Sequence, residues 1–133
     1  LMPIVMKVRS GEIKELAIYG NDYDTRDGTC IRDYIHVVDL ALGHLKSMQA
    51  FEKTGTSIYN LGSGRGTSVL EIMHAFEEAN HAALPHRFDD RRPGDLAEIF
   101  ADPSKAKREL NWETTHTIED AMRDTINFLD SAK

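Results

Sequence analysis

The sequence predicts a small mixed α/β domain in which several helices cover short strands. The chain has 133 residues and a hydrophobic content of 41%, which suffices for one core but not for two. Apolar side chains recur at helical spacing in several segments, and short apolar runs between them end at turn residues. We therefore expect one α/β domain over residues 1–133, without repeats or internal linkers.

The first predicted elements are a helix and a strand, followed by a long polar loop. Pro3 suits a first helical turn, and Ser10-Gly11 is expected to end that helix. Residues 16–19 are predicted as a strand, and residues 20–28 are rich in turn formers. The expected inner face of the helix consists of Leu1, Ile4, Val5 and Val8.

The next segment is predicted as a strand, a helix and a second strand. Residues 33–37 alternate as an extended segment does, and residues 57–61 form the later strand. The helix between them has Asp39 in its first turn, where a negative charge suits the helix dipole. Its apolar stripe, which we expect in the core, consists of Val38, Ala41, Leu42, Leu45 and Met48.

A capping box marks the start of the next predicted helix. Ser68 and Glu71 have the spacing that such a box requires. Beyond this helix, residues 87–88 and 99–101 are predicted as short strands around an Arg-Pro-Gly turn. The apolar stripe of the helix consists of Val69, Ile72, Met73 and Phe76.

Two more helices complete the predicted fold. Asp102 is a helix cap, and Pro103 suits the first turn of a helix that runs to Leu110. Thr117 and Asp120 are expected to cap the final helix. Its apolar stripe consists of Ile118, Met122, Ile126 and Leu129.

The composition of the chain argues against nucleic-acid, membrane and metal partners. With 16 basic and 22 acidic residues the formal net charge is -6, so we expect no nucleic-acid partner. Cys30 is the single cysteine, which predicts a protein of the reducing cytoplasm. No apolar run approaches the ~18 residues that span a bilayer, so no membrane partner is expected. The six histidines are scattered, and no metal site is predicted.

A glycine-rich segment over residues 62–67 follows the second predicted strand and could indicate a dinucleotide-binding loop. Counted from Gly62, however, the third glycine of Gly-x-Gly-x-x-Gly falls at Thr67, whose side chain hinders close packing of helix on strand. We therefore predict no cofactor-binding residue here. The segment is interpreted as a tight turn beside a nucleotide pocket, to which Asn60 contributes.

Two arginines and one carboxylate predict a site for a nucleoside diphosphate. Arg32 follows the polar loop and Arg92 precedes a rigid Pro-Gly turn, so both can present paired N–H donors to a diphosphate. Asp95 can accept both hydroxyls of a ribose. The simpler alternatives are ion pairs between Arg32 and either Asp27 or Asp33, and between Arg91 and either Asp89 or Asp90.

No catalytic residue is predicted in the chain. None of the four tyrosines has a lysine four residues later, and no Gly-x-Ser-x-Gly occurs. Leu1 is not an initiator residue, and an apolar segment follows it at once. We therefore expect a fragment of a longer enzyme that holds substrate and lacks the reacting half.

The motifs of this chain resemble the C-terminal part of the UDP-glucose 4-epimerase family, within the extended short-chain dehydrogenase/reductase group. The resemblance covers essentially the whole chain. It is specific because related nucleotide-sugar enzymes usually have a shorter loop before the Arg-Asp motif. The matching segments include Asn21-Asp22-Tyr23-Asp24-Thr25, Asp27-Gly28-Thr29, Arg32-Asp33-Tyr34-Ile35-His36-Val37, Tyr59-Asn60-Leu61-Gly62-Ser63-Gly64, Arg92-Pro93-Gly94-Asp95 and Leu110-Asn111-Trp112.

The resemblance implies a substrate and a role for each site residue. The family interconverts UDP-glucose and UDP-galactose through hydride removal and return at sugar C4 by a bound NAD. Arg32 and Arg92 would then hold the diphosphate, and Asp95 would meet the ribose. Ile99 stands where some members carry tyrosine, which suggests a roomier pocket that accepts N-acetylated sugars. The residues implied to flank the uracil are Ala17, Ile18 and Tyr19.

The resemblance also implies what lies outside the chain. The NAD-binding loop and the Tyr-x-x-x-Lys pair belong upstream of Leu1, so the chain would be the substrate domain without its Rossmann half. We expect the isolated chain to be inactive and to self-associate, and the full enzyme to be a homodimer. The alternatives are another nucleotide-sugar dehydratase, decarboxylase or epimerase of the group, or a non-catalytic nucleotide-binding module.

Overall fold

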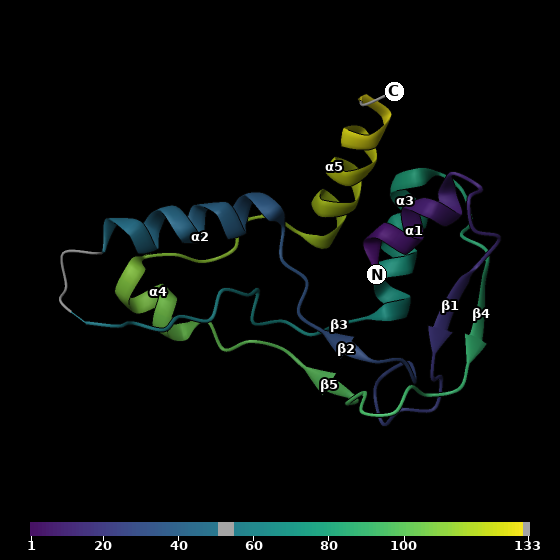
Figure 1. The fold of residues 1–133 in the computed structure, drawn as a ribbon, viewed down its shortest axis with the longest axis horizontal. Helices are drawn as coiled ribbons and strands as arrows, with labels where there is room; N and C mark the ends of the chain where they lie inside the picture. Colours follow the sequence, from purple (N-terminus) through teal and green to yellow (C-terminus); the bar gives the residue numbers. More distant parts are fainter. Residues whose placement is uncertain (51–54, 132–133) are drawn as a thin grey trace.

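The computed structural model of the chain describes residues 1–50 and 55–131 and has the expected mixed α/β architecture (Figure 1). Helices α2 and α4 lie at one end of the molecule and α1, α3 and α5 toward the other, with β1 and β4 at the outer edge beside α1 and α3 and with β2, β3 and β5 below α3 in this view. The helices are α1 (Met2–Arg9), α2 (Val37–Gln49), α3 (Val69–Asn80), α4 (Ser104–Leu110) and α5 (Ile118–Ser131). The strands are β1 (Leu16–Tyr19), β2 (Ile31–Arg32), β3 (Thr67–Ser68), β4 (His86–Asp89) and β5 (Glu98–Ile99).

The described strands form two small sheets. In the first, β1 pairs in parallel with β4, and Tyr19 lies opposite Asp89. In the second, β2 is central, antiparallel to β3 and parallel to β5. Its register places Arg32 opposite both Thr67 and Ile99. The second sheet therefore brings together three segments that are far apart in the sequence.

The main core lies where α3 packs on α5, with α1 and β1 beside them (Figure 1). The predicted capping box of α3 is present, because Ser68 and Glu71 each accept the backbone N–H of the other. The expected reciprocal cap of α5 between Thr117 and Asp120 is also present. The buried residues of this core are Val5, Val8, Leu16, Ile18, Ile72, Met73, Ala75, Phe76, Leu84, Met122 and Ile126.

A second, smaller cluster joins α2 to α4 around Trp112. The indole of Trp112 donates to the carbonyl of Asp39 at 2.9 Å. Gly43 faces the same cluster, where an added Cβ would lie 2.7 Å from Leu61 and 3.1 Å from Trp112. Helix α2 therefore approaches its neighbours through its small and polar positions.

Asp39, in the first turn of α2 beside this cluster, is a buried carboxylate with 1% of its surface exposed. It accepts hydrogen bonds from the N–H groups of Thr115 and His116 and from the Thr115 hydroxyl. The His116 ring lies 2.9 Å from the same carboxylate and stacks on His36. Burial alone raises the pKa of Asp39, but hydrogen bonds from His116 and Thr115 outweigh it and leave the pKa below its ordinary value.

The prediction that the apolar stripe of α2 lies in the core is wrong, because the structure places these side chains on the surface. Leu45 is 55% exposed and Met48 is 61% exposed, and Val38, Ala41 and Leu42 are exposed as well. The buried positions of the helix are instead Asp39 and Gly43. Helical spacing is correct here, but spacing alone cannot tell which neighbour covers the apolar face. Within the described residues, nothing covers it.

The predicted strand over residues 57–61 is also wrong for this structure, which has no strand there. A strand exists only when its backbone pairs with another strand. No described strand pairs with it, although Lys105 on α4 donates to the carbonyl of Ile58 at 2.9 Å, and Ile58 is 76% exposed. The exposed apolar face of α2 is called the α2 face below.

Smaller differences concern the ends of predicted elements. Residues 33–37 are not a strand, since β2 ends at Arg32 and the His36 ring caps α2 by accepting the N–H of Val38 at 3.1 Å. Strand β5 ends before Phe100. Helix α4 begins at Ser104, whose N–H bonds to the expected cap Asp102. Leu1 and Ile4 are exposed instead of facing the core.

None of the described helices is long and apolar enough to cross a membrane.

Candidate functional site

The loop before β2 is held in place by its own side chains, and this positions Arg32. Asp27 accepts from the N–H and hydroxyl of Thr29 and from the hydroxyl of Ser68. Burial raises the pKa of Asp27, but these hydrogen bonds outweigh it and lower the pKa overall. Arg26 pairs with Glu71 on α3. The loop is thereby fastened to the start of α3, directly beside the strand that ends at Arg32.

Arg32 and Arg92 converge on the single carboxylate of Asp95. Nε of Arg92 donates to one carboxylate oxygen at 2.8 Å, and Nη2 of Arg32 lies 3.8 Å from the other oxygen. Nη1 of Arg32 also donates to the carbonyl of Ile31 at 2.7 Å, which limits its freedom. The predicted pair of guanidiniums and the predicted carboxylate therefore lie in one place, although 60 residues separate Arg32 from Arg92 in the sequence.

The tight turn from Arg92 to Asp95 explains why these two side chains meet. The N–H of Asp95 donates to the carbonyl of Arg92 at 3.2 Å. Pro93 and Gly94 occupy the central positions, and Gly94 has a φ of 86°, a conformation that favours glycine. The two residues at the ends of such a turn are neighbours, so the Arg-Pro-Gly-Asp sequence brings cation and anion together by itself.

The three residues expected to flank a uracil all lie on β1, but they differ in how exposed they are. The guanidinium of Arg92 lies over the ring of Tyr19, 4.7 Å from its centroid, and thus connects β1 to the arginine pair. Ile18 is buried in the main core, so only its backbone could meet a ligand. Ala17 is half-buried between them.

Ile99 and Asn60 occupy different surroundings. Ile99 lies on β5 opposite Arg32 and is half-exposed, next to the arginine pair. The roomier sugar pocket expected from Ile99 stays a prediction. Asn60 is exposed, and its amide reaches the carbonyl of Asp102 at 3.5 Å. Among the described residues, no hydrogen bond joins Asn60 to Arg32 or Arg92.

The simpler pairings considered for the arginines do not occur in the structure. Arg32 contacts Asp95 in place of Asp27 or Asp33. Arg91 pairs with Asp22 at 2.7 Å, and its guanidinium lies 4.2 Å from the ring centroid of Tyr23. Arg91 is thus used to hold the loop before β2, whereas Arg92 points to the site.

Asp33 positions the segments around the site, a role that the sequence analysis did not predict for it. Its carboxylate accepts the N–H groups of Ser63, Gly64 and Ala101 and the Ser63 hydroxyl, at 2.6 to 3.2 Å. It therefore fastens the residue after Arg32 to the glycine turn and to the segment after β5. The only sequence signal was its place inside the Arg-Asp motif.

The glycine turn packs against the protein itself. A Cβ at Gly62 would lie 2.4 Å from the Asp33 carboxylate, and a Cβ at Gly66 would lie 2.3 Å from Ile31. In a dinucleotide loop, the glycines are needed so that the backbone can approach the ligand's pyrophosphate. These glycines instead admit neighbouring side chains, so the residues of this turn do not fit NAD.

Tyr23 is a second residue that the sequence analysis did not select. It is 6% exposed, and its hydroxyl has no hydrogen-bond partner of normal geometry in the described part of the chain. Burial raises the pKa of Tyr23, and the nearby Cys30 and Asp95 add to the rise. The phenol therefore stays neutral beneath the site and gives Arg91 a rigid ring to stack on.

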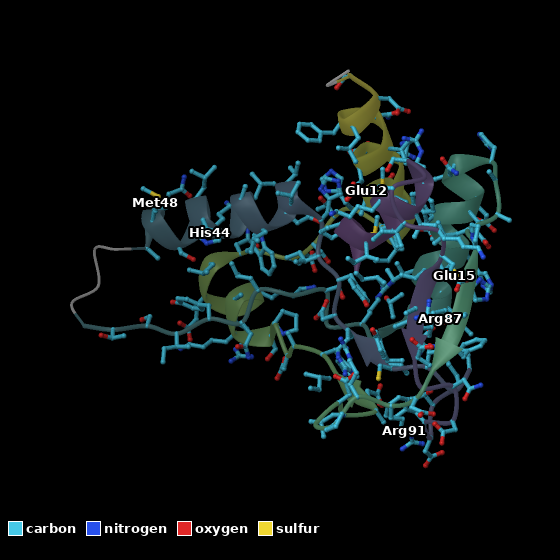
Figure 2. The ribbon with its side chains drawn as sticks, turned by 45° about the vertical axis from the view of Figure 1, so that its right-hand side comes forward. Glu12, Glu15, His44, Met48, Arg87 and Arg91 are labelled. Atoms are coloured by element: carbon cyan, nitrogen blue, oxygen red, sulfur yellow. The ribbon has the colours of Figure 1, made fainter. Side chains whose placement is uncertain are left out.

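The side chains gathered at this place are suited to binding a ligand. Two guanidiniums, one carboxylate and an aromatic ring can hold a phosphorylated nucleoside. Within residues 1–50 and 55–131, no group of His, Cys, Asp or Glu side chains could hold a metal ion. Figure 2 shows Arg91 at the end of the molecule opposite to Met48, so the arginine-rich end lies far from the α2 face.

Comparisons with known proteins agree on one family. The family described as GDP-mannose 4,6 dehydratase matches residues 1–125. UDP-glucose 4-epimerase of Bacillus subtilis is 53% identical over 126 residues, which cover 94% of this chain and 37% of that protein. UDP-glucose 4-epimerase of Pasteurella multocida is 50% identical over 94% of this chain and 37% of its own length.

Solved structures agree with the sequence comparison. UDP-glucose 4-epimerase of Bifidobacterium longum, in complex with NAD+ and UDP, matches 97% of this chain with a TM-score of 0.91 and 49% identity. The Stenotrophomonas maltophila enzyme, with bound NAD and formylated UDP-arabinopyranose, matches 99% of this chain with a TM-score of 0.93 and 44% identity. This chain spans only 38% and 40% of those chains, and its fold matches their C-terminal part.

Proposed function

The chain belongs to the GDP-mannose 4,6 dehydratase family. Within that family we propose that it is the substrate-binding part of a UDP-glucose 4-epimerase, the enzyme to which its relatives belong. In this proposal the chain holds UDP-glucose or UDP-galactose by the UDP group, and the longer enzyme interconverts the two sugars. The relatives at about half identity over nearly the whole chain are UDP-glucose 4-epimerases, which supports this function over a dehydratase or a decarboxylase.

The observation that carries the proposal is the convergence of Arg32 and Arg92 on Asp95. Each guanidinium can donate two N–H groups to phosphate oxygens, and two guanidiniums can share the charge of one diphosphate. The carboxylate between them can accept ribose hydroxyls. Tyr19 borders the same place through its contact with Arg92 and offers a ring edge for the base.

The chemical step is assigned to the part of the enzyme outside this chain. NAD there would supply hydride removal and return at sugar C4, with a Tyr-x-x-x-Lys pair as acid and base. The residues described here bind and orient the nucleotide. We further propose a cytoplasmic enzyme of galactose metabolism that acts as a homodimer.

The experiment that tests the function begins with the gene. We expect the coding sequence upstream of Leu1 to contain a glycine-rich NAD loop and Tyr-x-x-x-Lys. The full gene product should convert UDP-galactose to UDP-glucose in a coupled assay, while the 133-residue chain alone should give no turnover above buffer. An upstream sequence without that pair, or turnover by the chain alone, would contradict the proposal.

The α2 face is proposed to be covered by the rest of the enzyme. An unpaired strand-like segment and an exposed apolar helix face are surfaces that other elements of a larger fold usually cover. Left uncovered, an apolar surface promotes association between copies. The isolated chain should therefore self-associate through the α2 face.

We expect the double variant Leu42→Lys and Leu45→Lys to weaken this self-association about tenfold or more, because each leucine contributes ~1.5–3 kcal/mol when buried. Sedimentation equilibrium over a wide concentration range measures the change. Phe128→Lys is the matched control, since Phe128 is exposed on α5 and outside the α2 face. Unchanged association in the double variant, or an equal loss in the control, would show that another surface is responsible.

A further inference from the structure

Arg32 lies at the end of a strand that is only two residues long. Strand β2 consists of Ile31 and Arg32, and Arg32 is its last residue paired with both β3 and β5. The end of such a short strand opens readily, because few backbone hydrogen bonds hold it. A guanidinium at this position therefore needs a further restraint if it is to meet a ligand in one fixed orientation.

The carboxylate of Asp33 supplies this restraint on both sides of β2. One oxygen accepts the N–H and the hydroxyl of Ser63, at 2.9 and 2.6 Å. The other oxygen accepts the N–H groups of Gly64 and Ala101, both at 3.2 Å. Ser63 and Gly64 precede β3, and Ala101 follows β5. One side chain thus holds both neighbours of β2 at the point where the backbone pairing stops.

The surroundings of this carboxylate fit it closely. A Cβ added to Gly62 would lie 2.4 Å from the carboxylate and 2.7 Å from the side chain of Ala101. The Ser63 hydroxyl accepts the N–H of Arg65 at 3.1 Å, which orients its own hydrogen toward Asp33. Because four donors occupy the two oxygens, the carboxylate is engaged in holding backbone segments and has no role left in contacting a ligand.

Arg32 and Asp33 are neighbours in the chain but use different partners. The guanidinium of Arg32 lies near Asp95 and donates to the carbonyl of Ile31, whereas the carboxylate of Asp33 faces the glycine turn. Successive side chains of an extended backbone point to opposite sides. A fixed Asp33 therefore fixes the backbone from which Arg32 projects, without itself approaching the arginine pair.

We propose that Asp33 is a positioning residue, which holds the end of β2 so that Arg32 presents its guanidinium to a diphosphate in one orientation. The inference rests on the proposed function, because it concerns the same diphosphate site, but it assigns a role to a residue outside that site. The role concerns the phosphate groups alone. A nucleoside without phosphates does not use Arg32 and does not depend on Asp33.

The variant Asp33→Asn has two opposed consequences, and this makes the test decisive. Considered as a change of charge alone, it removes a negative group from the neighbourhood of a diphosphate and should tighten UDP binding. Considered as loss of the restraint, it should weaken UDP binding. Asparagine keeps one acceptor oxygen, but its NH₂ group cannot accept the N–H of Gly64 or Ala101. The direction of the change in UDP affinity therefore distinguishes the two roles.

The test compares two ligands in matched variants of the chain. UDP and uridine are titrated separately into the wild type, Asp33→Asn and Asp120→Asn by isothermal titration calorimetry, and urea unfolding verifies that each variant is folded. Asp120→Asn is the control, because Asp120 also accepts a backbone N–H and a hydroxyl, those of Thr117, but at the start of α5. It removes the same charge and the same kind of hydrogen bond from another place.

We expect Asp33→Asn to weaken UDP binding about 5- to 50-fold, as loss of preorganisation at one charge-assisted contact allows, and to change uridine affinity less than about twofold. The control should leave both affinities within about twofold of the wild type. Unchanged or tighter UDP binding in Asp33→Asn overturns the inference. An equal loss for UDP and uridine also overturns it, because it would indicate general loosening of the fold.

A double-mutant cycle with Arg32 tests the same role through UDP alone. In the Arg32→Ala background the guanidinium to be positioned is absent, so Asp33→Asn should weaken UDP binding by less than about twofold more. Fully additive losses would show that Asp33 acts on the ligand independently of Arg32. If Asp33→Asn does not fold, Ser63→Ala removes one of the four donors, keeps the carboxylate and should weaken UDP binding about 2- to 5-fold.

The two proposals can fail separately. If the wild-type chain does not bind UDP, the proposed substrate site is contradicted, and amide hydrogen exchange then decides the role of Asp33 without a ligand. The N–H of Ile31 donates to the carbonyl of Ala97 at 2.8 Å and reports on β2 itself. Its exchange should be at least about tenfold faster in Asp33→Asn, and an unchanged rate rejects the role. If UDP binds but Asp33→Asn does not weaken it, only the role of Asp33 is rejected.

Discussion

Replacement of Asp39 by alanine is expected to lower the free energy of unfolding by about 2–4 kcal/mol, since buried donors lose their acceptor. Four groups point at this carboxylate, two backbone N–H groups, one hydroxyl and one imidazole. They belong to Thr115 and His116, which precede α5, so the variant separates α2 from the segment that positions α5. Urea unfolding followed by circular dichroism measures the loss. Glu12→Ala, in an exposed ion pair, should change stability by no more than about 0.5 kcal/mol.

The pH dependence of this effect follows from the lowered pKa of Asp39. Its folded-state pKa lies below the ordinary value of 3.8, so the carboxylate stabilises the fold above about pH 4. That contribution disappears as the pH falls through the lower, folded-state value. The difference between wild type and Asp39→Ala should therefore be full at pH 7 and shrink below pH 4. A difference that grows on acidification would contradict the role assigned to this carboxylate.

Removal of either site guanidinium is expected to weaken UDP binding by about 10- to 100-fold, the value of one charge-assisted pair of hydrogen bonds. Arg32→Ala and Arg92→Ala test this separately, with UDP titrated into each variant at physiological salt. Arg92→Lys should recover only part of the loss, because an ammonium keeps the charge but not the planar pair of donors.

Arg91→Ala is the matched control for this series. Arg91 is next to Arg92 in the sequence, and its replacement by alanine removes the same charge. The Arg91 side chain, however, pairs with Asp22 and lies over the ring of Tyr23. We expect it to change UDP affinity less than about threefold, as a screened, more distant charge should. If Arg91→Ala weakens UDP binding as strongly as Arg92→Ala does, the loss comes from the general positive charge of this region, and the proposed site is wrong.

Much of the fold could be predicted from local signals. The capping box at Ser68, the reciprocal cap at Thr117 and the strand over residues 16–19 all depend on residues close in sequence. The Arg-Pro-Gly-Asp turn is of the same kind, because proline and glycine determine its backbone and thereby join Arg92 to Asp95. Such features need no knowledge of distant neighbours.

The predictions that were wrong have one cause in common: each concerned a contact with a segment far away in the sequence. The spacing of Leu45 and Met48 correctly predicts a helix, yet burial depends on a surface that must come from elsewhere. Residues 57–61 have the composition of a strand, but pairing requires a second strand alongside. The true partner of Arg91, Asp22, lies 69 residues away and could not be distinguished from nearer carboxylates.

The class of fold, the helix caps, the tight turn and the family motifs could be identified from the chain alone, because each depends on residues close together along it. The folded arrangement was needed to show that Arg32 meets Arg92 on one carboxylate, that Asp33 joins three segments and that α2 leaves its apolar face uncovered. These contacts join segments far apart in the chain. Their formation depends on how the whole backbone packs, which no local pattern specifies.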